Sequence, residues 1–270
     1  MPELPEVEVW RRLIVDWLRE DAITNVVFLD PALLDEEKRR SAEIHLAGRD
    51  VRGISRLGKL LFWDCPNAPT LGVHLRMTGG WARTAPGVPR PRFTRASWGL
   101  ASGSSVHFID SRRLGRWYWG KPDAVREAMG VQKLGPDALH SLPDEGILQE
   151  RMQRRHTLKS ALMDQSVVAG IGNIAATEIC FRARLSPWTR PDQMTLEQWG
   201  SIRTQIQCHL EESIARDAGH TIVYVNAGGI NPFALYAREA QPCPACSHPI
   251  ERRVQSGRST YFCARCQPLD

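Results

Sequence analysis

The chain has 270 residues, of which 42% are hydrophobic and 24% charged, as in an ordinary globular protein, and its length allows two modest domains. No apolar run approaches the ~20 residues that span a bilayer, and the acidic N-terminus is not a signal peptide, so we expect a cytoplasmic protein with no membrane partner. The net charge of +5 favours a polyanionic partner. The basic residues are nearly all arginine, and this bias suits nucleic-acid binding, although codon bias in a GC-rich genome would produce it as well.

The first part of the chain combines one helix with a long β-rich region. Residues 4–20 carry Val7, Trp10, Ile14 and Leu18 at helical spacing, which predicts an amphipathic helix. From about residue 22 to 120, short apolar runs alternate with Gly, Pro, Asn and Ser, which predicts an all-β sandwich. The runs are Val51–Ile54, Leu60–Trp63, Leu71–Leu75, Trp98–Ala101 and Val106–Ile109.

The second part of the chain reads as helical. Residues 121–147 are rich in Pro, Gly and Asp and are predicted to form a linker. Helical patterns follow from about 147 to 218, interrupted by a tight AGIGN turn at residues 169–173. Residues 219–238 are expected to form a loop.

The last thirty residues contain two CxxC pairs separated by sixteen residues. Four thiolates in two knuckles complete a tetrahedral site for one structural Zn²⁺, and the segment between them has the length of a β-hairpin. The alternatives are disulfides or a redox-active CxxC, which a reducing compartment disfavours. The four predicted ligands are Cys243, Cys246, Cys263 and Cys266.

The N-terminus offers a reactive amine. Removal of Met1 would leave Pro2 with a secondary amine whose reference pKa of about 8 keeps part of it neutral at physiological pH. Attack of such an amine on a sugar C1′ gives an iminium ion that has no N–H proton to lose, and this fixed charge favours elimination of the 3′-phosphate. Glu3 can act as general acid, and Glu6 can hold the amine or a water. The alternative is that Pro2 and Glu3 simply start a helix.

Five segments, in order along the chain, resemble the formamidopyrimidine-DNA glycosylase/endonuclease VIII family, and the opening PELPE is closer to the formamidopyrimidine branch. The segments are MPELPEVE, HLRMTG, DSRRLG, LMDQSVVAGIGNIAATE and CPAC…CARC. The resemblance implies an α+β protein with a β-sandwich and leading helix in residues 1–133, a helix–two-turn–helix domain in 134–238 and a zinc-finger hairpin in 239–270. It implies damaged double-stranded DNA as the partner, bound between the two domains, and a monomer associated with the nucleoid.

The resemblance also assigns roles to single residues. Pro2 matches the nucleophile, Glu3 the acid, Glu6 an assisting glutamate, and Lys59 a lysine that reaches a phosphate beside the lesion. Further DNA contacts match Lys159, Asn173 and Arg258. The space left by a flipped nucleotide would be filled by Met77, Arg112 and Leu114, although core packing for Met77 and Leu114, and a plain surface charge for Arg112, are the alternatives.

The sequence departs from the family pattern where the lesion is recognised. Leu114 stands where the formamidopyrimidine branch usually has phenylalanine, and the loop 219–232 lacks the family's glycine- and threonine-rich pattern. Three hypotheses follow. The first is a bifunctional glycosylase/lyase that removes oxidised purines such as 8-oxoguanine and formamidopyrimidines by β,δ-elimination; the second is the same chemistry on oxidised pyrimidines or another lesion; the third is a zinc-dependent protein that binds damaged DNA without cutting it.

Overall fold

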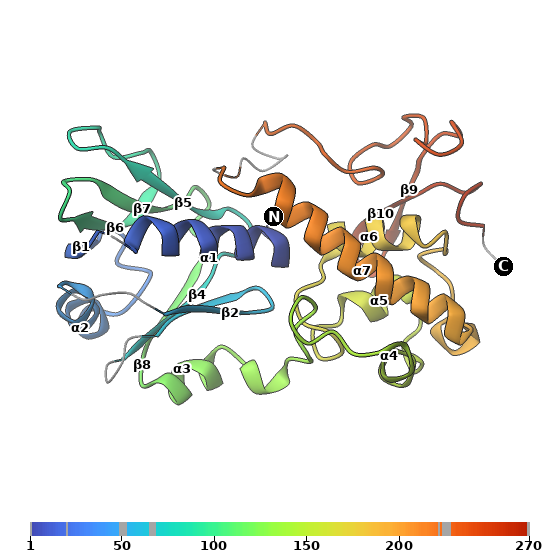
Figure 1. The fold of residues 1–270 in the computed structure, drawn as a ribbon, viewed down its shortest axis with the longest axis horizontal. Coiled ribbons are helices and arrows are strands. Elements are labelled where there is room, and N and C mark those ends of the chain that lie inside the picture. The colour runs from blue at the N-terminus through green and yellow to red at the C-terminus, as the bar shows by residue number, and fades with distance from the viewer. Residues whose placement is uncertain are drawn as a thin grey trace. The chain divides into compact units, whose positions relative to one another are not determined.

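The computed structural model describes residues 2–19, 21–48, 53–64, 69–220, 222 and 228–268. The chain divides into two compact units, one made of Met1–Gln132 and Asp217–Tyr224 and the other of Lys133–Arg216 and Val225–Asp270 (Figure 1). Within the described residues, no helix is long and apolar enough to cross a membrane.

The first unit is built on two antiparallel four-stranded sheets. One sheet has the order β1-β6-β7-β5 and the other β2-β3-β4-β8. The strands of the first sheet are β1 (Ile23–Phe28), β5 (Gly79–Thr84), β6 (Thr94–Leu100) and β7 (Ser105–Asp110). The strands of the second sheet are β2 (Ile54–Leu57), β3 (Leu60–Trp63), β4 (Thr70–His74) and β8 (Arg116–Gly120).

Tryptophan side chains from both sheets meet in the core between them. Trp63 of the second sheet lies 5.5 Å from Trp81 and 5.3 Å from Trp98 of the first sheet, measured between ring centroids. Trp117 of the second sheet stacks on Trp98 at 5.8 Å. Large aromatic rings fill the space between two twisted sheets and add favourable ring contacts to the area that they bury. The predicted sandwich is therefore confirmed.

Three helices pack on the sandwich. Helix α1 (Leu4–Leu18) contacts β5 of one sheet and β2 and β3 of the other. Helices α2 (Glu36–Leu46) and α3 (Pro122–Ala128) both contact β8. Neither α2, within the β-rich region, nor α3, within the predicted linker, was expected from the sequence, because each helix buries only one or two apolar side chains and so lacks a clear periodic face. Helix α3 also contacts β4 at Gly72, where a side chain would collide with Met129.

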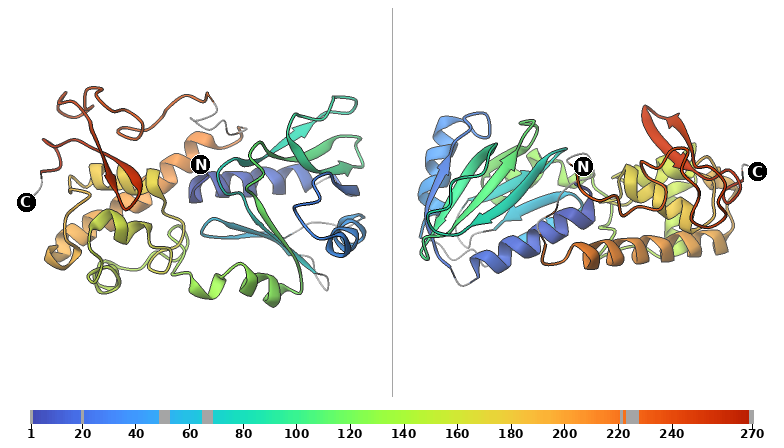
Figure 2. Two further views of the ribbon diagram at one scale, coloured as in Figure 1. Left: turned by 180° about the vertical axis from the view of Figure 1, so that it is seen from behind. Right: turned by 90° about the horizontal axis from the view of Figure 1, so that it is seen from above.

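The second unit joins short helices to a C-terminal β-hairpin. Its helices are α4 (Glu145–Met152), α5 (Leu158–Met163), α6 (Asn173–Arg182) and α7 (Leu196–Asp217). The hairpin pairs β9 (Glu251–Gln255) with β10 (Arg258–Phe262) in antiparallel register. The right-hand view of Figure 2 shows the hairpin and α7 on opposite sides of the shorter helices. Helix α4 begins at Glu145, inside the segment predicted as linker, because the Asp144 side chain accepts the Ile147 N–H and caps it.

A buried carboxylate anchors α1 to the sandwich. Glu8 is 1% exposed, and it accepts hydrogen bonds from Arg11 at 2.8 Å, Arg12 at 2.8 Å and the equally buried Arg56 of β2 at 3.0 Å. Burial alone would raise the pKa of Glu8, but the three arginines outweigh it and lower the pKa to about 2. The ion pairs therefore fix the helix that Pro2 and Glu3 immediately precede.

We predict that Glu8→Gln lowers the free energy of unfolding at pH 7 by about 3–5 kcal/mol, because it leaves Arg56 buried beside a neutral partner. The matched control is Glu36→Gln, which breaks an exposed pair with Arg40 and should cost at most about 1 kcal/mol. Because the pKa of Glu8 is lowered, its contribution is present above pH 4.5 and is lost as the pH falls towards 2. Urea unfolding at pH 7 and pH 3 measures both effects; equal losses in the two variants at pH 7 would contradict the prediction.

Candidate functional site

The predicted nucleophile and acids lie together at the start of α1. Pro2, Glu3 and Glu6 are all buried, and Glu3 is the N-cap residue of the helix. The Glu3 backbone N–H donates to Glu6 Oε2 at 2.8 Å, while the Glu3 side chain accepts from the Glu6 N–H in a reciprocal capping box. These residues therefore do start a helix, as the alternative interpretation held, and the same arrangement places two carboxyl groups beside Pro2.

The carboxyl of Glu6 is held in an environment that favours its protonated form. Burial, together with the neighbouring charge of Glu3, raises the pKa of Glu6 to about 7. A carboxyl group that titrates near neutral pH can both give and take a proton under physiological conditions. The start of α1 thus places a group suited to proton transfer close to Pro2.

A neutral histidine lies beside the predicted phosphate-binding lysine. Lys59 occupies the turn between β2 and β3, and His74 ends β4, whose register pairs it with Leu60. Burial, together with the charges of Arg76 and Lys59, lowers the pKa of His74 to about 4. Its Nδ1 accepts the Arg76 N–H at 3.0 Å, which leaves the proton on Nε2. Sequence reasoning missed His74, although it lies in the HLRMTG motif.

Asp110 brings together the two loops that carry Met77, Arg112 and Leu114. Its side chain accepts hydrogen bonds from the Thr78 hydroxyl, from the Arg112 N–H at 3.2 Å and from the Gly115 N–H at 2.7 Å. It is 1% exposed, so these bonds form away from water. One buried carboxylate therefore fixes both loop backbones.

The three predicted void-filling residues lie outside the core. Leu114 is 39% exposed, Arg112 is exposed and Met77 is half-buried. The Arg112 guanidinium has no hydrogen-bond partner within the described part of the chain, whereas its neighbour Arg113 binds Asp30 through two bonds of 2.7 and 2.6 Å. Arg113 thus anchors the loop and leaves Arg112 able to reach a ligand.

In the second unit, two predicted DNA-binding residues converge on the hairpin. Lys159 of α5 is 1% exposed and donates to Thr260 Oγ1 at 2.6 Å and to the Ser259 carbonyl at 3.3 Å. Asn173 begins α6 and donates to the same Ser259 carbonyl at 3.1 Å. Both side chains hold β10 against the helices. Arg258, at the start of β10, is exposed and lines a cavity of ≈ 350 Å³ together with Lys159.

The turn before α6 has the geometry that its glycines suggest. Gly170 adopts φ 114°, which a residue with a side chain rarely reaches. Gln165 spans the turn, since its Oε1 accepts the Gly170 N–H at 2.9 Å and its Nε2 donates to the Ile171 carbonyl at 2.7 Å. The start of α6 is therefore set rigidly by a side chain that sequence reasoning did not single out.

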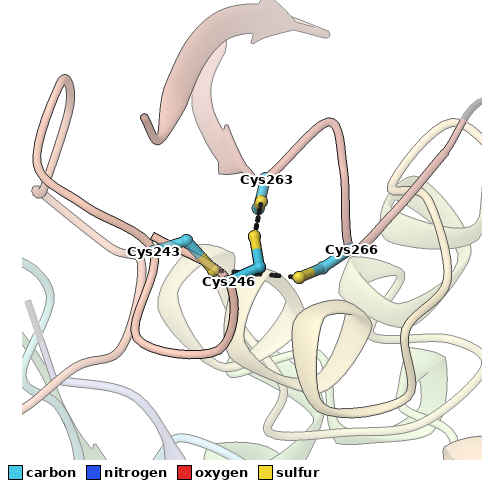
Figure 3. A group of neighbouring side chains, drawn as sticks. All are labelled: Cys243, Cys246, Cys263 and Cys266. Carbon is cyan, nitrogen blue, oxygen red and sulfur yellow. Dashed lines mark hydrogen bonds between the residues drawn. The ribbon is translucent and has the colours of Figure 1, made fainter. Parts of the chain in front are cut away.

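The four predicted zinc ligands form one cluster (Figure 3). Their sulfur atoms all lie within 4.8 Å of one another, with Cys243 and Cys266 at 3.9 Å and Cys246 and Cys263 at 3.4 Å. Thiolates that share one tetrahedral Zn²⁺ lie about 3.8 Å apart, so the cluster fits the metal. Burial and the three neighbouring thiols raise the pKa of the Cys266 thiol to about 12, and the charge of a bound metal would favour its thiolate form. The cysteines hold one structural zinc.

A buried carboxylate, also missed by sequence reasoning, joins α6 to the segment before the zinc finger. Glu178 is 3% exposed, and it accepts the backbone N–H groups of Ala234, Leu235 and Tyr236 at 2.8, 3.0 and 2.9 Å. Three charge-assisted bonds to consecutive amides hold that backbone in one conformation. Leu235 in turn packs with Cys243 and Cys263, so Glu178 supports the metal site from the helix side.

Comparisons with known proteins place all three parts of the chain. Residues 1–117 match the formamidopyrimidine-DNA glycosylase N-terminal domain, residues 134–224 its H2TH domain, and residues 240–269 the zinc finger found in FPG and IleRS. A formamidopyrimidine-DNA glycosylase of Moorella thermoacetica is 37% identical over 258 residues, which are 93% of this chain and 94% of that protein.

Solved structures match along the whole fold. MutM in complex with DNA containing carbocyclic 8-oxo-G is 25% identical with a TM-score of 0.85, over 99% of this chain and all of that one. Lactococcus lactis Fpg in complex with DNA containing an oxidised pyrimidine is 26% identical with a TM-score of 0.86, over the same shares of both chains.

We predict that Cys246→Ser, or removal of zinc by a chelator, unfolds the hairpin while the first unit stays folded, because the metal supplies most of the hairpin's stability. Bound zinc should fall from one ion per chain to nearly none, amide exchange across β9 and β10 should lose its protection, and DNA affinity should fall at least about tenfold as Arg258 loses its fixed position. Cys208→Ser, which removes a thiol outside the cluster, is the control. Protected hairpin amides in the metal-free protein would disprove the prediction.

We also predict an unusual pH dependence of stability from Glu6. Its raised pKa means that the folded chain keeps a proton that the unfolded chain releases near pH 4.5, so stability present below pH 4.5 is lost as the pH rises through 7. The full effect is at most about 3 kcal/mol. Urea unfolding between pH 4 and 8 should show a steeper decline for the native chain than for Glu6→Gln, and identical slopes would rule out a raised pKa.

Proposed function

The chain belongs to the formamidopyrimidine-DNA glycosylase family, and on that premise we propose that it excises oxidised purines through the Pro2 amine and then cleaves the strand by β,δ-elimination. It is a DNA glycosylase of base excision repair, and it binds lesion-containing DNA. Membership of a family of named glycosylases favours the enzyme over the non-catalytic DNA-binding alternative. The observation that carries the mechanism is the buried pair of Glu3 and Glu6 beside Pro2.

The proposed reaction begins with the free amine of Pro2, once Met1 has been removed. The nitrogen attacks C1′ of the damaged nucleoside, the C1′–base bond breaks, and the base leaves with a proton. Glu3 protonates the ring oxygen as the deoxyribose opens, and the product is an iminium ion on Pro2. Because this nitrogen carries no proton, its positive charge persists, and loss of a proton from C2′ then expels the 3′-phosphate. A second elimination expels the 5′-phosphate.

Glu6 is well suited to the proton transfers that surround this attack. Its pKa of about 7 allows it to accept the proton that the amine must lose before it can attack, and to return that proton later in the cycle. Glu6 also holds the Glu3 backbone through its 2.8 Å bond, so it orients the acid as well. We therefore assign proton transfer and positioning to Glu6, and direct protonation of the sugar to Glu3.

The phosphates that flank the lesion are proposed to meet basic and dipolar groups on both units. Lys59 offers a point charge, and neutral His74 offers its Nε2–H beside it. In the second unit, Arg258 and the turn at the start of α6 offer a cation and backbone N–H groups. Lys159 and Asn173 act mainly through the hairpin, since both bind the Ser259 carbonyl and so fix Arg258.

The flipped nucleotide leaves a hole that Met77, Arg112 and Leu114 are proposed to fill. Arg112 has no internal partner among the described residues, and its N–H groups suit the acceptors of an orphaned cytosine better than adenine, which presents a donor. Leu114 supplies apolar bulk without the aromatic ring that adds about 1–3 kcal/mol when it stacks on a base. We propose that the enzyme prefers lesions opposite cytosine and acts as a monomer on nucleoid DNA.

The second candidate is the same chemistry on an oxidised pyrimidine. A relative of similar fold has been solved with DNA containing such a lesion, and Leu114 weakens the aromatic part of the wedge. The altered loop 219–232, expected to cap the lesion, lies partly outside the described residues, which leave out 221 and 223–227. We place oxidised purines first because the family name and the MutM complex both point to them.

Borohydride trapping tests the proposal. With a duplex carrying 8-oxoguanine opposite cytosine, we expect a covalent adduct on the N-terminal peptide that starts at Pro2, because reduction fixes the iminium ion. Glu3→Gln should lower the excision rate about 100-fold or more, as expected for loss of a general acid. Pro5→Ala, which changes the other proline near the start of α1, should leave the adduct intact.

The substrates separate the remaining outcomes. An adduct with an abasic-site duplex but none with 8-oxoguanine, together with an adduct on an oxidised pyrimidine, would favour the second candidate. Full strand cleavage by Pro2→Gly, or a retained Met1 in the active protein, would disprove the mechanism.

A further inference from the structure

Three loops meet at one end of the β1-β6-β7-β5 sheet, and the proposed void-filling residues lie on only two of them. The loop before β5 carries Met77, and the loop after β7 carries Arg112 and Leu114. The third loop joins β5 to β6 and ends at Phe93, directly before β6. The Phe93 carbonyl accepts the Asp110 N–H at 3.1 Å, and the Asp110 side chain holds the other two loops. Phe93 therefore lies in the same loop cluster as the void-filling residues.

Each of these loops contains one residue that is not glycine and yet adopts the left-handed backbone region. The residues are Arg76 with φ 55°, Phe93 with φ 66° and Arg113 with φ 56°. In the described part of the first unit, no other residue besides glycine has a positive φ. A bulky side chain rarely adopts this conformation, and such strain gathers at functional sites. Arg76 and Arg113 each adjoin a void-filling residue in the sequence, whereas the strain at Phe93 has no such explanation.

The Phe93 ring is held in place although it is 39% exposed. The Arg92 guanidinium lies 4.5 Å from the ring centroid, in a cation–π contact. Arg92 has no hydrogen bond or ion pair within the described residues, so this contact is what orients its guanidinium. On either side of the pair in the sequence, the Thr94 hydroxyl donates to the Pro91 carbonyl at 2.6 Å and closes a tight turn. A fixed backbone thus presents an aromatic ring to water, where its apolar surface gains nothing from burial.

An aromatic ring at this end of the sheet has a use in the proposed reaction. Leu114 stands where the formamidopyrimidine branch usually has phenylalanine, so the loop after β7 has no ring to stack on a base. Flipping a nucleotide exposes the flat faces of the bases around it, and aromatic side chains stack on such faces whatever the base. Phe93 is the exposed aromatic side chain that the neighbouring loop offers for this contact.

We propose that Phe93 is a specificity-determining residue, whose ring stacks on a base exposed by the flipped nucleotide and supplies the aromatic contact that Leu114 lacks. An undamaged duplex keeps its bases stacked and offers Phe93 no such face. The ring therefore adds to the preference for lesion-containing DNA and contributes little to the binding of undamaged DNA. The inference rests on the proposed function, because the base face is exposed only if the enzyme flips the nucleotide.

The test compares the binding of two duplexes by the full-length zinc-bound protein. One duplex carries a tetrahydrofuran abasic-site analogue opposite cytosine, which cannot react with the Pro2 amine, and the other is undamaged. We expect Phe93→Leu to weaken binding of the analogue duplex at least about fivefold, the lower end of what one base–aromatic stack contributes. Binding of the undamaged duplex should change less than about twofold, because its contacts are to phosphates. Fluorescence anisotropy at one fixed salt concentration measures both affinities.

Further variants separate stacking from a loss of structure. Adding Leu114→Phe to Phe93→Leu places a ring on the neighbouring loop and should restore most of the lost affinity, whereas a folding defect would persist. The matched control is Val88→Ala, which trims an exposed side chain of the β5–β6 loop in a cavity shared with Val27 of β1, and it should leave both affinities unchanged. If Phe93→Leu does not fold, Phe93→Met removes the ring while keeping a similar volume and should show the same loss.

The outcomes distinguish the inference from the proposed function. A native chain that prefers the analogue duplex, with Phe93→Leu unchanged or weakened equally on both duplexes, overturns the inference alone. No recovery in the double variant overturns it as well, since the loss would then not come from the missing ring. A native chain that shows no preference for the analogue duplex and gives no borohydride adduct overturns the proposed function, and the inference with it.

Discussion

A nucleophile at the end of a chain has covalent support on one side only, so everything that holds it must come from the residues that follow it. In the mechanism proposed for Pro2, that support is the first turn of α1, where the Glu3 backbone is bonded to Glu6 at 2.8 Å. The position of this first turn depends on Glu8, whose buried ion pair with Arg56 joins α1 to β2. Catalytic geometry and the stability of the sandwich are therefore properties of one short helix.

The same turn sets the chemistry as well as the position. Two carboxyl groups in one buried place cannot both ionise easily, and the raised pKa of Glu6 follows from burial and from its neighbour Glu3. A capping box on an exposed helix would leave Glu6 an ordinary acid. Here the fold buries the start of the helix, so a side chain that commonly caps a helix N-terminus also becomes a proton-transfer group.

The second unit holds an exposed arginine, Arg258, in a fixed position beside the turn of a small hairpin. Zinc fixes the base of the hairpin, while Lys159 and Asn173 bind one carbonyl of β10 from two separate helices. Glu178 secures the segment that enters the zinc finger. Each of these groups is buried and polar, so each bond strengthens in the low dielectric and is costly to break. Arg258 can then approach a phosphate with little loss of conformational entropy.

The sequence by itself determined the features that depend on local spacing. Short stretches of sequence contain the paired thiolates, the apolar period of α1, the alternation of the β-rich region and the glycines of the AGIGN turn. The zinc site, the sandwich and the family were therefore predictable from them.

Only the tertiary structure decided the features that depend on burial by distant residues. Helix α2 and helix α3 were missed because their weak apolar faces are defined by contact with β8. Lys159 is buried against β10, a hundred residues away in the sequence. The altered pKa values of Glu6, His74 and His209 arise mainly from burial. The sequence states which ionisable side chains the chain carries. Their burial and their hydrogen-bond and ion-pair partners arise only when segments remote in the sequence pack together, and these two factors set the pKa and the role of each side chain.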